Sequence, residues 1–183
     1  MEKSEPPFRI LVMAGGTGSR MDFPDKGILL VQGQTLIGRN LSMLSSYSDE
    51  IYIAVSPKTT ITKKVFENTY KIIETEGNGY SEDLNYSLKR IDRYPILTVA
   101  ADLFIEKPDV IRKFIEFART KGKGIVTLLS DGLFCGLSYF FSDPERIGEE
   151  LFFTMDVKGK QVRNINTTID FFALINRMNK LTK

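Results

Sequence analysis

The chain has 183 residues, of which 42% are hydrophobic and 26% charged, and its formal net charge is +2. These values predict one globular domain over residues 1–183 that buries its core without disulfides, and the small charge argues against nucleic acid as a partner. The sequence contains no histidine, which excludes Ser–His–Asp and Cys–His catalysis and histidine metal sites.

Apolar runs alternate along the chain with segments of helical periodicity. The runs predict strands at residues 8–14, 51–55, 70–75, 95–101, 124–129, 133–141 and 161–165. Apolar residues three and four apart predict helices at residues 35–47, 58–68, 79–91, 108–120, 144–153 and 168–180. This alternation is typical of an α/β three-layer sandwich, in which helices cover both faces of a mostly parallel central sheet.

Such sheets bind ligands beyond the carboxyl ends of their strands. We therefore expect the loops that follow Ala14, Val55, Thr75 and Ala101 to share one edge and to surround one site. The sequence shows no internal repeat and no linker between domains.

Cysteine usage and terminal composition favour a protein of the cytoplasm. The one cysteine, Cys135, lies in an apolar run, so we expect a buried structural thiol rather than a disulfide or a nucleophile. Residues 1–7 lack the apolar core of a secretory signal, and no stretch approaches the ~20 apolar residues of a membrane span.

A glycine-rich loop follows the first predicted strand. It reads Ala14, Gly15, Gly16, Thr17, Gly18, Ser19 and Arg20, and Lys26 comes six residues later. Glycines let backbone N–H groups approach an anion, and the two cations add charge, which together suit a nucleoside triphosphate. The loop lacks the Gly-Lys-Ser/Thr of a P-loop and the third glycine of a dinucleotide-binding loop; an ordinary strand–turn is the alternative interpretation.

Asp102 directly follows the most apolar predicted strand. A carboxylate at that edge is suited to hold Mg²⁺, which prefers oxygen ligands and shares them with substrate phosphates. A helix cap or turn aspartate is the alternative.

Two further polar clusters lie at predicted element ends. In the segment 77–85, Gly79 allows close approach of a ligand and Asp83 or Glu82 can accept hydrogen bonds from a ribose or base, although helix capping explains the cluster too. Near the end of the chain, Asn166 can offer an oxygen to a metal, and an Asx turn or N-cap is the alternative.

These motifs together resemble a known family. The glycine loop with Arg20 and Lys26, Asp102 after a buried strand, and Asn164-Ile-Asn-Thr near the end are similar to the three motifs of the MobA-like nucleotidyltransferases, in family order. The segment Gly-x-Gly-Tyr-x-x-Asp-Leu-Asn at 77–85 resembles the archaeal type of GTP:adenosylcobinamide-phosphate guanylyltransferase. The resemblance implies a Rossmann-like nucleotidyltransferase fold and a reaction of cobalamin assembly that uses GTP and Mg²⁺.

The resemblance also implies roles for individual residues. Residues 14–20, Gly79 and Asp83 would bind the nucleotide, and Arg20 and Lys26 would stabilise charge on the phosphates. Asp102 would hold the metal, Asn166 would complete that site, and Gly136 would lie beside the acceptor. The chain departs from the family pattern at Asp22, which replaces a glycine, and at Asp25-Lys26-Gly27, where the cobinamide enzymes often have Glu-Lys-Pro; the stretch 148–160 matches no family motif.

Three functions follow from this interpretation. The first is transfer of GMP from GTP to adenosylcobinamide phosphate, with release of pyrophosphate. The second is nucleotidyl transfer to molybdopterin or a sugar phosphate, and the third is a regulatory protein that binds nucleotide without turnover. The residues themselves do not determine the base or the acceptor, and they leave open whether the protein forms a homodimer.

Overall fold

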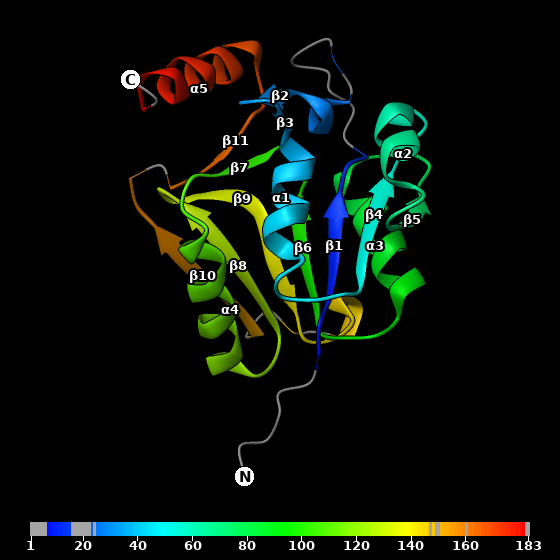
Figure 1. The fold of residues 1–183 in the computed structure, drawn as a ribbon. Coiled ribbons are helices and arrows are strands. Elements are labelled where there is room, and N and C mark those ends of the chain that lie inside the picture. Colours follow the sequence, from blue (N-terminus) through cyan, green and yellow to red (C-terminus); the bar gives the residue numbers. More distant parts are fainter. Residues whose placement is uncertain are drawn as a thin grey trace.

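The computed structural model describes residues 7–15, 23, 25–146, 148, 151–159 and 161–181. Its centre is a seven-stranded sheet in the order β10-β8-β9-β6-β1-β4-β5 (Figure 1). The strands are β1 Arg9–Met13, β4 Ile51–Val55, β5 Lys71–Glu74, β6 Ile96–Ala100, β8 Ile125–Ser130, β9 Leu133–Phe140 and β10 Phe152–Val157. All of them run parallel except β9, which is antiparallel to both of its neighbours, β6 and β8. The expected mostly parallel sheet is confirmed.

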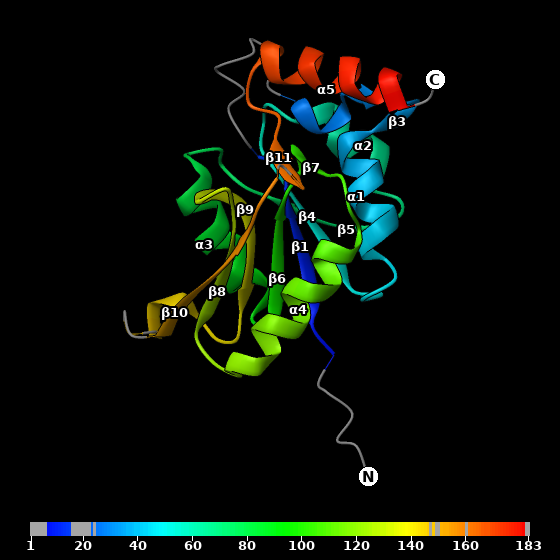
Figure 2. The ribbon, with the colours of Figure 1, turned by 90° about the vertical axis from the view of Figure 1, so that its left-hand side faces the viewer.

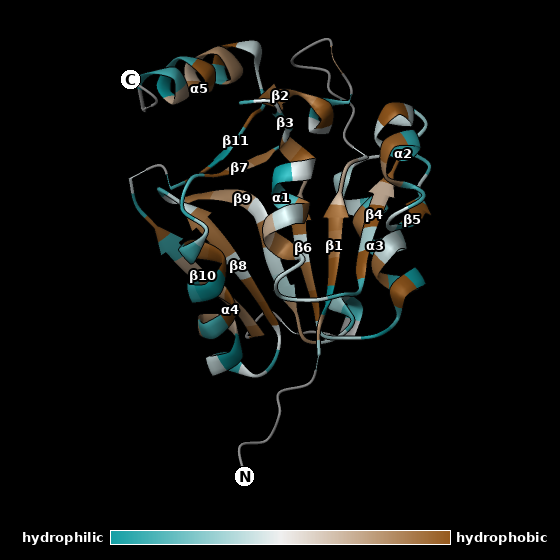
Figure 3. Cartoon of the chain, in the orientation of Figure 1, coloured by the Kyte–Doolittle hydropathy of each residue, from teal (hydrophilic) through white to brown (hydrophobic). Residues whose placement is uncertain are grey.

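Helices cover both faces of this sheet, as a three-layer sandwich requires. Figure 2 shows α1 Leu36–Leu44 and α4 Asp109–Lys121 on one side and α3 Tyr80–Ile91 on the other. The short α2 Thr60–Phe66 lies beside β4. Hydrophobic residues concentrate in the strands and polar residues on the outer helix faces (Figure 3). Among the described helices, none is long and apolar enough to cross a membrane.

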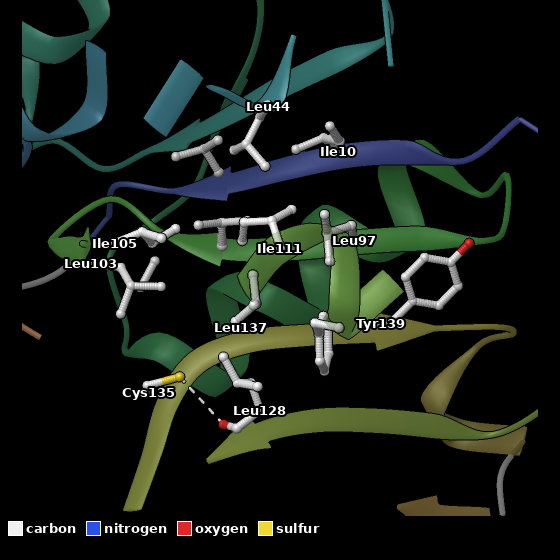
Figure 4. Close-up of a cluster of buried hydrophobic side chains, with 14 of the residues drawn as sticks. Ile10, Leu44, Leu97, Leu103, Ile105, Ile111, Leu128, Cys135, Leu137 and Tyr139 are labelled. Atoms are coloured by element: carbon white, nitrogen blue, oxygen red, sulfur yellow. Dashed lines mark hydrogen bonds between the residues drawn. The ribbon is translucent and has the colours of Figure 1, made fainter. Parts of the chain in front are cut away.

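The larger core lies between the sheet and the α1–α4 layer. Inward residues of α1 and α4 such as Leu41, Phe114 and Ile111 are fully or almost fully buried there, against alternate residues of the strands. Cys135 belongs to this cluster, where its thiol donates a hydrogen bond to the carbonyl of Leu128 at 3.3 Å (Figure 4). Burial raises the pKa of the Cys135 thiol to about 11, and the expectation that this thiol is buried is confirmed.

Smaller elements gather at the carboxyl ends of the parallel strands, at the top of Figure 1. Strand β7 Leu103–Ile105 pairs antiparallel with β11 Val162–Asn164, and β2 Leu30–Val31 forms a hairpin with β3 Gln34–Thr35. Helix α5 Thr168–Leu181 packs on them through a separate apolar cluster. This packing brings β11 and α5, near the end of the chain, to the edge where the sequence predicts a site.

The predicted helix at 144–153 is wrong. Pro144–Arg146 form a 3₁₀ turn, η2, and residues 152–157 form strand β10 beside β8. Side chains alternate along β10: Phe153 and Met155 pack on the core, while Phe152 and Thr154 are exposed. Such a period of two is the pattern of an edge strand.

A network of ion pairs joins neighbouring strands at the opposite, amino-terminal edge of the sheet. Glu50, just before β4, accepts hydrogen bonds from Arg9 of β1 and Lys71 of β5 at 2.9 Å each and from Tyr52 at 2.8 Å, and it also pairs with Arg93. The bond from Lys71 contributes most to lowering the pKa of Glu50 from 4.5 to about 2, with Tyr52 and Arg9 adding to it. One carboxylate thus holds three neighbouring strands together.

We expect Glu50→Gln to reduce the free energy of unfolding at pH 7 by about 1–2 kcal/mol, because solvent screens this partly exposed network below the full value of the pKa shift. A carboxyl group whose pKa is lowered in the folded state stabilises the fold above its unfolded pKa. The wild type should therefore lose this contribution as the pH falls from 4.5 towards 2.

Urea denaturation of both proteins between pH 7 and pH 2 measures the effect. The difference between wild type and variant should shrink on acidification. A difference that stays constant with pH would contradict the proposed ionic origin of the stabilisation.

Candidate functional site

The carboxyl ends of β1 and β6 and the start of α3 enclose a small pocket of about 80 Å³. Its lining includes Ala14, Gly15, Lys26, Gly27, Tyr80, Asp83, Ala101 and Asp102. A side chain built on Gly15 would meet Ser56 and Thr75, which follow β4 and β5. The four loops expected to share one edge therefore meet here, and this prediction is confirmed.

Lys26 and Asp102 face each other in the lining of this pocket. The ammonium of Lys26 donates a hydrogen bond to Asp102 Oδ2 at 3.1 Å, and the two side chains are only 13% and 20% exposed. The other carboxylate oxygen, Oδ1, receives no hydrogen bond from the described residues. Two residues that the sequence analysis selected for separate reasons thus form one charged centre.

The strand pairing places Asp102 there. β6 pairs in register with β1, and the N–H of Ala101 donates to the carbonyl of Met13 at 2.9 Å. The end of β6 is therefore fixed to the end of β1, where the glycine loop begins. Asp102 follows at once and points its carboxylate towards the same opening.

Lys26 is positioned by its neighbour Asp25, to which the sequence analysis gave no role. Asp25 is buried, and its carboxylate accepts hydrogen bonds from the backbone N–H of Thr62 at 2.9 Å and from its hydroxyl at 2.5 Å. Thr62 belongs to α2, so Asp25 ties the turn that carries Lys26 (η1 Lys26–Ile28) to that helix. A carboxylate directly before the lysine was the only sequence signal for this contact.

Asp83 approaches the glycine loop from α3. It is buried, and its Oδ1 accepts a hydrogen bond from the N–H of Gly77 at 3.1 Å. A Cβ on Gly15 would lie only 3.2 Å from Asp83 Oδ2, so the glycine lets the two segments close together. Gly79, with φ of +134°, precedes α3 and has open space where a side chain would be. The nucleotide-binding roles of Asp83 and Gly79 stay predictions.

Tyr80 is a pocket residue that the sequence analysis did not select. It is the first residue of α3, and about half of it is exposed. Although the residue as a whole is half exposed, desolvation around its phenol oxygen raises the pKa of that group to about 12, and the carboxylate of Asp102 adds to the rise. The hydroxyl therefore remains protonated at neutral pH and lies in the field of Asp102. The sequence signal that could have identified Tyr80 was its position in the motif at residues 77–85.

The backbone of Asn166 lies close to that of Asp102, but Asn166 lines a different cavity. The N–H of Ile165 donates to the carbonyl of Asp102 at 3.0 Å, which brings the next residue, Asn166, beside it. The N–H groups of Asn166 and Thr167 donate to Asp170, and the Thr167 hydroxyl accepts from the Asp170 N–H at 3.1 Å. These bonds cap α5, while the metal role of the Asn166 side chain stays a prediction.

The structure explains why position 136 is a glycine. Its φ is +79°, and a Cβ there would lie 2.8 Å from that of Ala100, which lines the pocket. It lies where β9 bulges against β8, between Thr127 and Leu129 of the partner strand. The glycine lets β9 approach the end of β6, and its acceptor role stays a prediction.

Residues 10–154 match the MobA-like NTP transferase domain. The chain belongs to this family. The MobA-like motif residues Gly16, Thr17, Gly18, Ser19 and Arg20 lie outside the described residues, and their nucleotide-binding roles remain predictions.

Two curated relatives share the MobA-like region. An adenosylcobinamide-phosphate guanylyltransferase of Methanocaldococcus jannaschii is 36% identical over 114 residues, which is 58% of each chain. A molybdenum cofactor guanylyltransferase of Pseudomonas syringae pv. tomato is 28% identical over 97 residues, covering 53% of this chain and 48% of the relative. The chain thus spans about half the length of the curated relatives it matches.

Solved structures share the MobA-like fold over nearly the whole chain. A Bacillus anthracis protein named for glucose-1-phosphate thymidylyltransferase superposes with a TM-score of 0.75 at 13% identity, over 93% of this chain and 95% of that one. Rv0371c of Mycobacterium tuberculosis, solved in complex with manganese, superposes with a TM-score of 0.70 at 14% identity, over 93% and 99% of the two chains. At these identities the likeness establishes the fold alone.

The donor atoms of this MobA-like site fit a divalent cation shared with a substrate. Within the described ranges, no three His, Cys, Asp or Glu side chains gather as a metal cluster. In the pocket lining, Asp102 supplies a carboxylate, the kind of oxygen ligand that a hard divalent cation takes together with water and substrate phosphate oxygens. The metal role of Asn166, which lines a different cavity, stays a prediction.

The anchoring of Lys26 can be tested through stability. We expect Asp25→Ala to lower the free energy of unfolding by about 1–3 kcal/mol, because it leaves the buried donors of Thr62 without an acceptor. Thr62→Val is the matched control: it removes only the hydroxyl and keeps the N–H bond, so it should cost less. Chemical denaturation measures both, and equal costs for the two variants would contradict the anchor.

Proposed function

We propose that this protein is a guanylyltransferase: its single nucleotidyltransferase domain transfers GMP from GTP to adenosylcobinamide phosphate and releases pyrophosphate. The observation that carries the proposal is the Lys26–Asp102 pair, 3.1 Å apart, in the lining of the pocket where the glycine loop begins. When a lysine and a carboxylate lie side by side, the lysine can interact with the negative phosphates of a substrate and the carboxylate with the cation bound to them. A site built only to bind a nucleotide has no need of both.

The reaction joins two anions, so the protein must lower their repulsion and align them. An oxygen of the acceptor phosphate attacks the α-phosphorus of GTP, the bond to the bridging oxygen breaks, and pyrophosphate leaves with that electron pair. The attacking phosphate oxygen carries no proton that must be removed, which agrees with a chain without histidine. Alignment by the glycine loop and the pocket walls can supply roughly 7–11 kcal/mol of the barrier reduction.

Each charged side chain has a separate task in this scheme. Lys26, released from Asp102 when the triphosphate enters, offsets the charge that develops on the transferred and leaving groups. Asp102 and Asn166 would hold Mg²⁺, which supplies positive charge to the phosphate oxygens. The Tyr80 hydroxyl, protonated at neutral pH, can donate a hydrogen bond to a phosphate oxygen at the same opening. Arg20 would add a second cation, as the family motif implies.

The acceptor and the base rest on resemblance. The motif at 77–85 and the relative named adenosylcobinamide-phosphate guanylyltransferase, at 36% identity, both support a cobinamide acceptor and GTP. The relative named molybdenum cofactor guanylyltransferase, at 28% identity, supports molybdopterin as the second candidate acceptor. The manganese complex among the structural neighbours agrees with use of a divalent cation, and we propose Mg²⁺.

Pyrophosphate release tests the function directly. The purified protein with Mg²⁺, GTP and adenosylcobinamide phosphate should release pyrophosphate, and release should require both the acceptor and GTP rather than ATP, CTP or UTP. Release with molybdopterin instead would move the acceptor to the second candidate. GTP binding by calorimetry without release under any acceptor would favour a non-catalytic nucleotide-binding protein.

Two variants test the charged pair. We expect Lys26→Ala to lower kcat by about 10²–10³, as for removal of one preorganised donor, and Asp102→Asn to raise the Mg²⁺ concentration needed for half-maximal rate. Lys113→Ala, on the exposed face of α4, is the control and should change neither quantity. A Lys26→Ala protein that folds and turns over at the normal rate would contradict this role.

A further inference from the structure

A second cavity opens at the outer edge of the sheet, between its last strand, β5, and helix α3, both at the right of Figure 1. Its volume is about 410 Å³, which is within the range of small-molecule sites. The sheet contributes Tyr52, Lys71 and residues 72–74 to its lining, and α3 contributes Tyr86 and Arg90. We refer to it as the β5 cavity. No described residue lines both this cavity and the pocket at the carboxyl edge.

Positive charge gathers at the sheet wall of the β5 cavity. Glu50, which accepts hydrogen bonds from the wall residues Tyr52 and Lys71, is one carboxylate shared by three cations. Glu74, the one acid among the described lining residues, is paired with Lys63 at 2.8 Å. These ion pairs leave more positive than negative charge beside the cavity, and such a surplus attracts an anion.

The two residues on the α3 wall are available to a ligand. Neither the guanidinium of Arg90 nor the side chain of Tyr86 forms a hydrogen bond or ion pair with the described residues, and Tyr86 is 47% exposed. Because they lie four residues apart, they share one face of α3. A guanidinium can bind a phosphate through two parallel hydrogen bonds, and an aromatic ring beside it can stack on a planar group attached to that phosphate.

The edge of the sheet supplies a third kind of contact. β5 is the last strand of the seven, so one side of its backbone faces no other described strand, and the N–H and C=O groups there can bond to a ligand. An extended peptide could use such groups too. However, β5 has only four residues and carries charged Lys71 and Glu74 at its ends, a pattern by which edge strands avoid pairing with a further strand. The edge therefore favours a small molecule with donors and acceptors along its rim.

We propose that the β5 cavity is a second, non-catalytic site that binds a nucleoside phosphate. The base stacks on Tyr86, the polar rim of the base meets the backbone edge of β5, and the phosphate pairs with Arg90 and Lys71. A nucleotide combines the three features that the walls select, namely a planar ring, adjacent donors and acceptors, and an anion. The inference does not depend on the proposed reaction.

Calorimetric titration with AMP tests the site. AMP should bind the wild type, and Arg90→Gln and Tyr86→Ser should each weaken that binding by about tenfold, because each variant loses one main contact of the ligand. Lys89→Gln is the matched control: it removes one positive charge from the same helix, but Lys89 pairs with Glu145 and does not line the cavity. It should leave the affinity unchanged, and so should Lys26→Ala, which alters the other pocket.

Three results of this titration would overturn the proposal. The first is that AMP does not bind the wild type. The second is an affinity that falls in Lys26→Ala but not in Arg90→Gln and Tyr86→Ser, which would place AMP in the pocket at the carboxyl edge. The third is inorganic phosphate that binds as tightly as AMP, since the cavity would then recognise an anion and not a base.

Photolabelling locates the ligand independently of its affinity. Irradiated 8-azido-AMP should attach to residues of β5 or of the second half of α3, as identified by mass spectrometry of the peptides, and excess AMP should prevent the labelling. Label confined to residues 14–26 would overturn the proposal. Neither measurement involves pyrophosphate release, so a failure of the proposed function leaves this test intact, and a failure here leaves the proposed function standing.

Discussion

The contact between Lys26 and Asp102 joins two segments that lie 76 residues apart in the sequence, and the arrangement of the site depends on it. Taking two charges partly out of water is costly, and a buried ion pair seldom stabilises a fold more than apolar residues would. The surrounding structure holds the pair in place from both sides. In-register pairing of β1 and β6 fixes Asp102, and the buried Asp25–Thr62 bonds fix the turn of Lys26. Function explains such a pair better than stability does.

Charge is distributed unevenly between the two edges of the sheet. At the amino-terminal edge, Glu50 is surrounded by cations and its interactions are complete within the protein. At the carboxyl edge, Lys26 and Asp102 are each other's only ion-pair partner within the part of the chain that the structure describes. The first arrangement resists change when ligands arrive. The second can exchange its internal contact for contacts with a phosphate and a cation.

Local pattern was sufficient to predict the strands and helices that form the sheet and its layers. The strand at 51–55 was predicted to the residue, and the strands and helices around β6, α3 and α4 were placed within about a residue or two of their ends. The residues that hold the site in place from outside its motifs were harder to predict. Asp25 matters because it is buried against a helix 37 residues away, and no short-range pattern reports that distance.

The misassigned segment shows where local pattern fails. Strand β10 depends on which distant element the second half of the chain packs against, because Phe153, Met155 and Val157 form an inner face only when β8 lies beside them. Tyr80 was visible in a motif, but its nearness to Asp102 follows only from the packing that brings α3 to the pocket.

The reversed direction of β9 has a consequence for this edge of the sheet. Because β9 alone runs against its neighbours in the sheet, its turn with β8 emerges at the same edge as the loops of the parallel strands. A change in the length or composition of that turn would alter this edge without disturbing the register of β1 and β6, which positions Asp102.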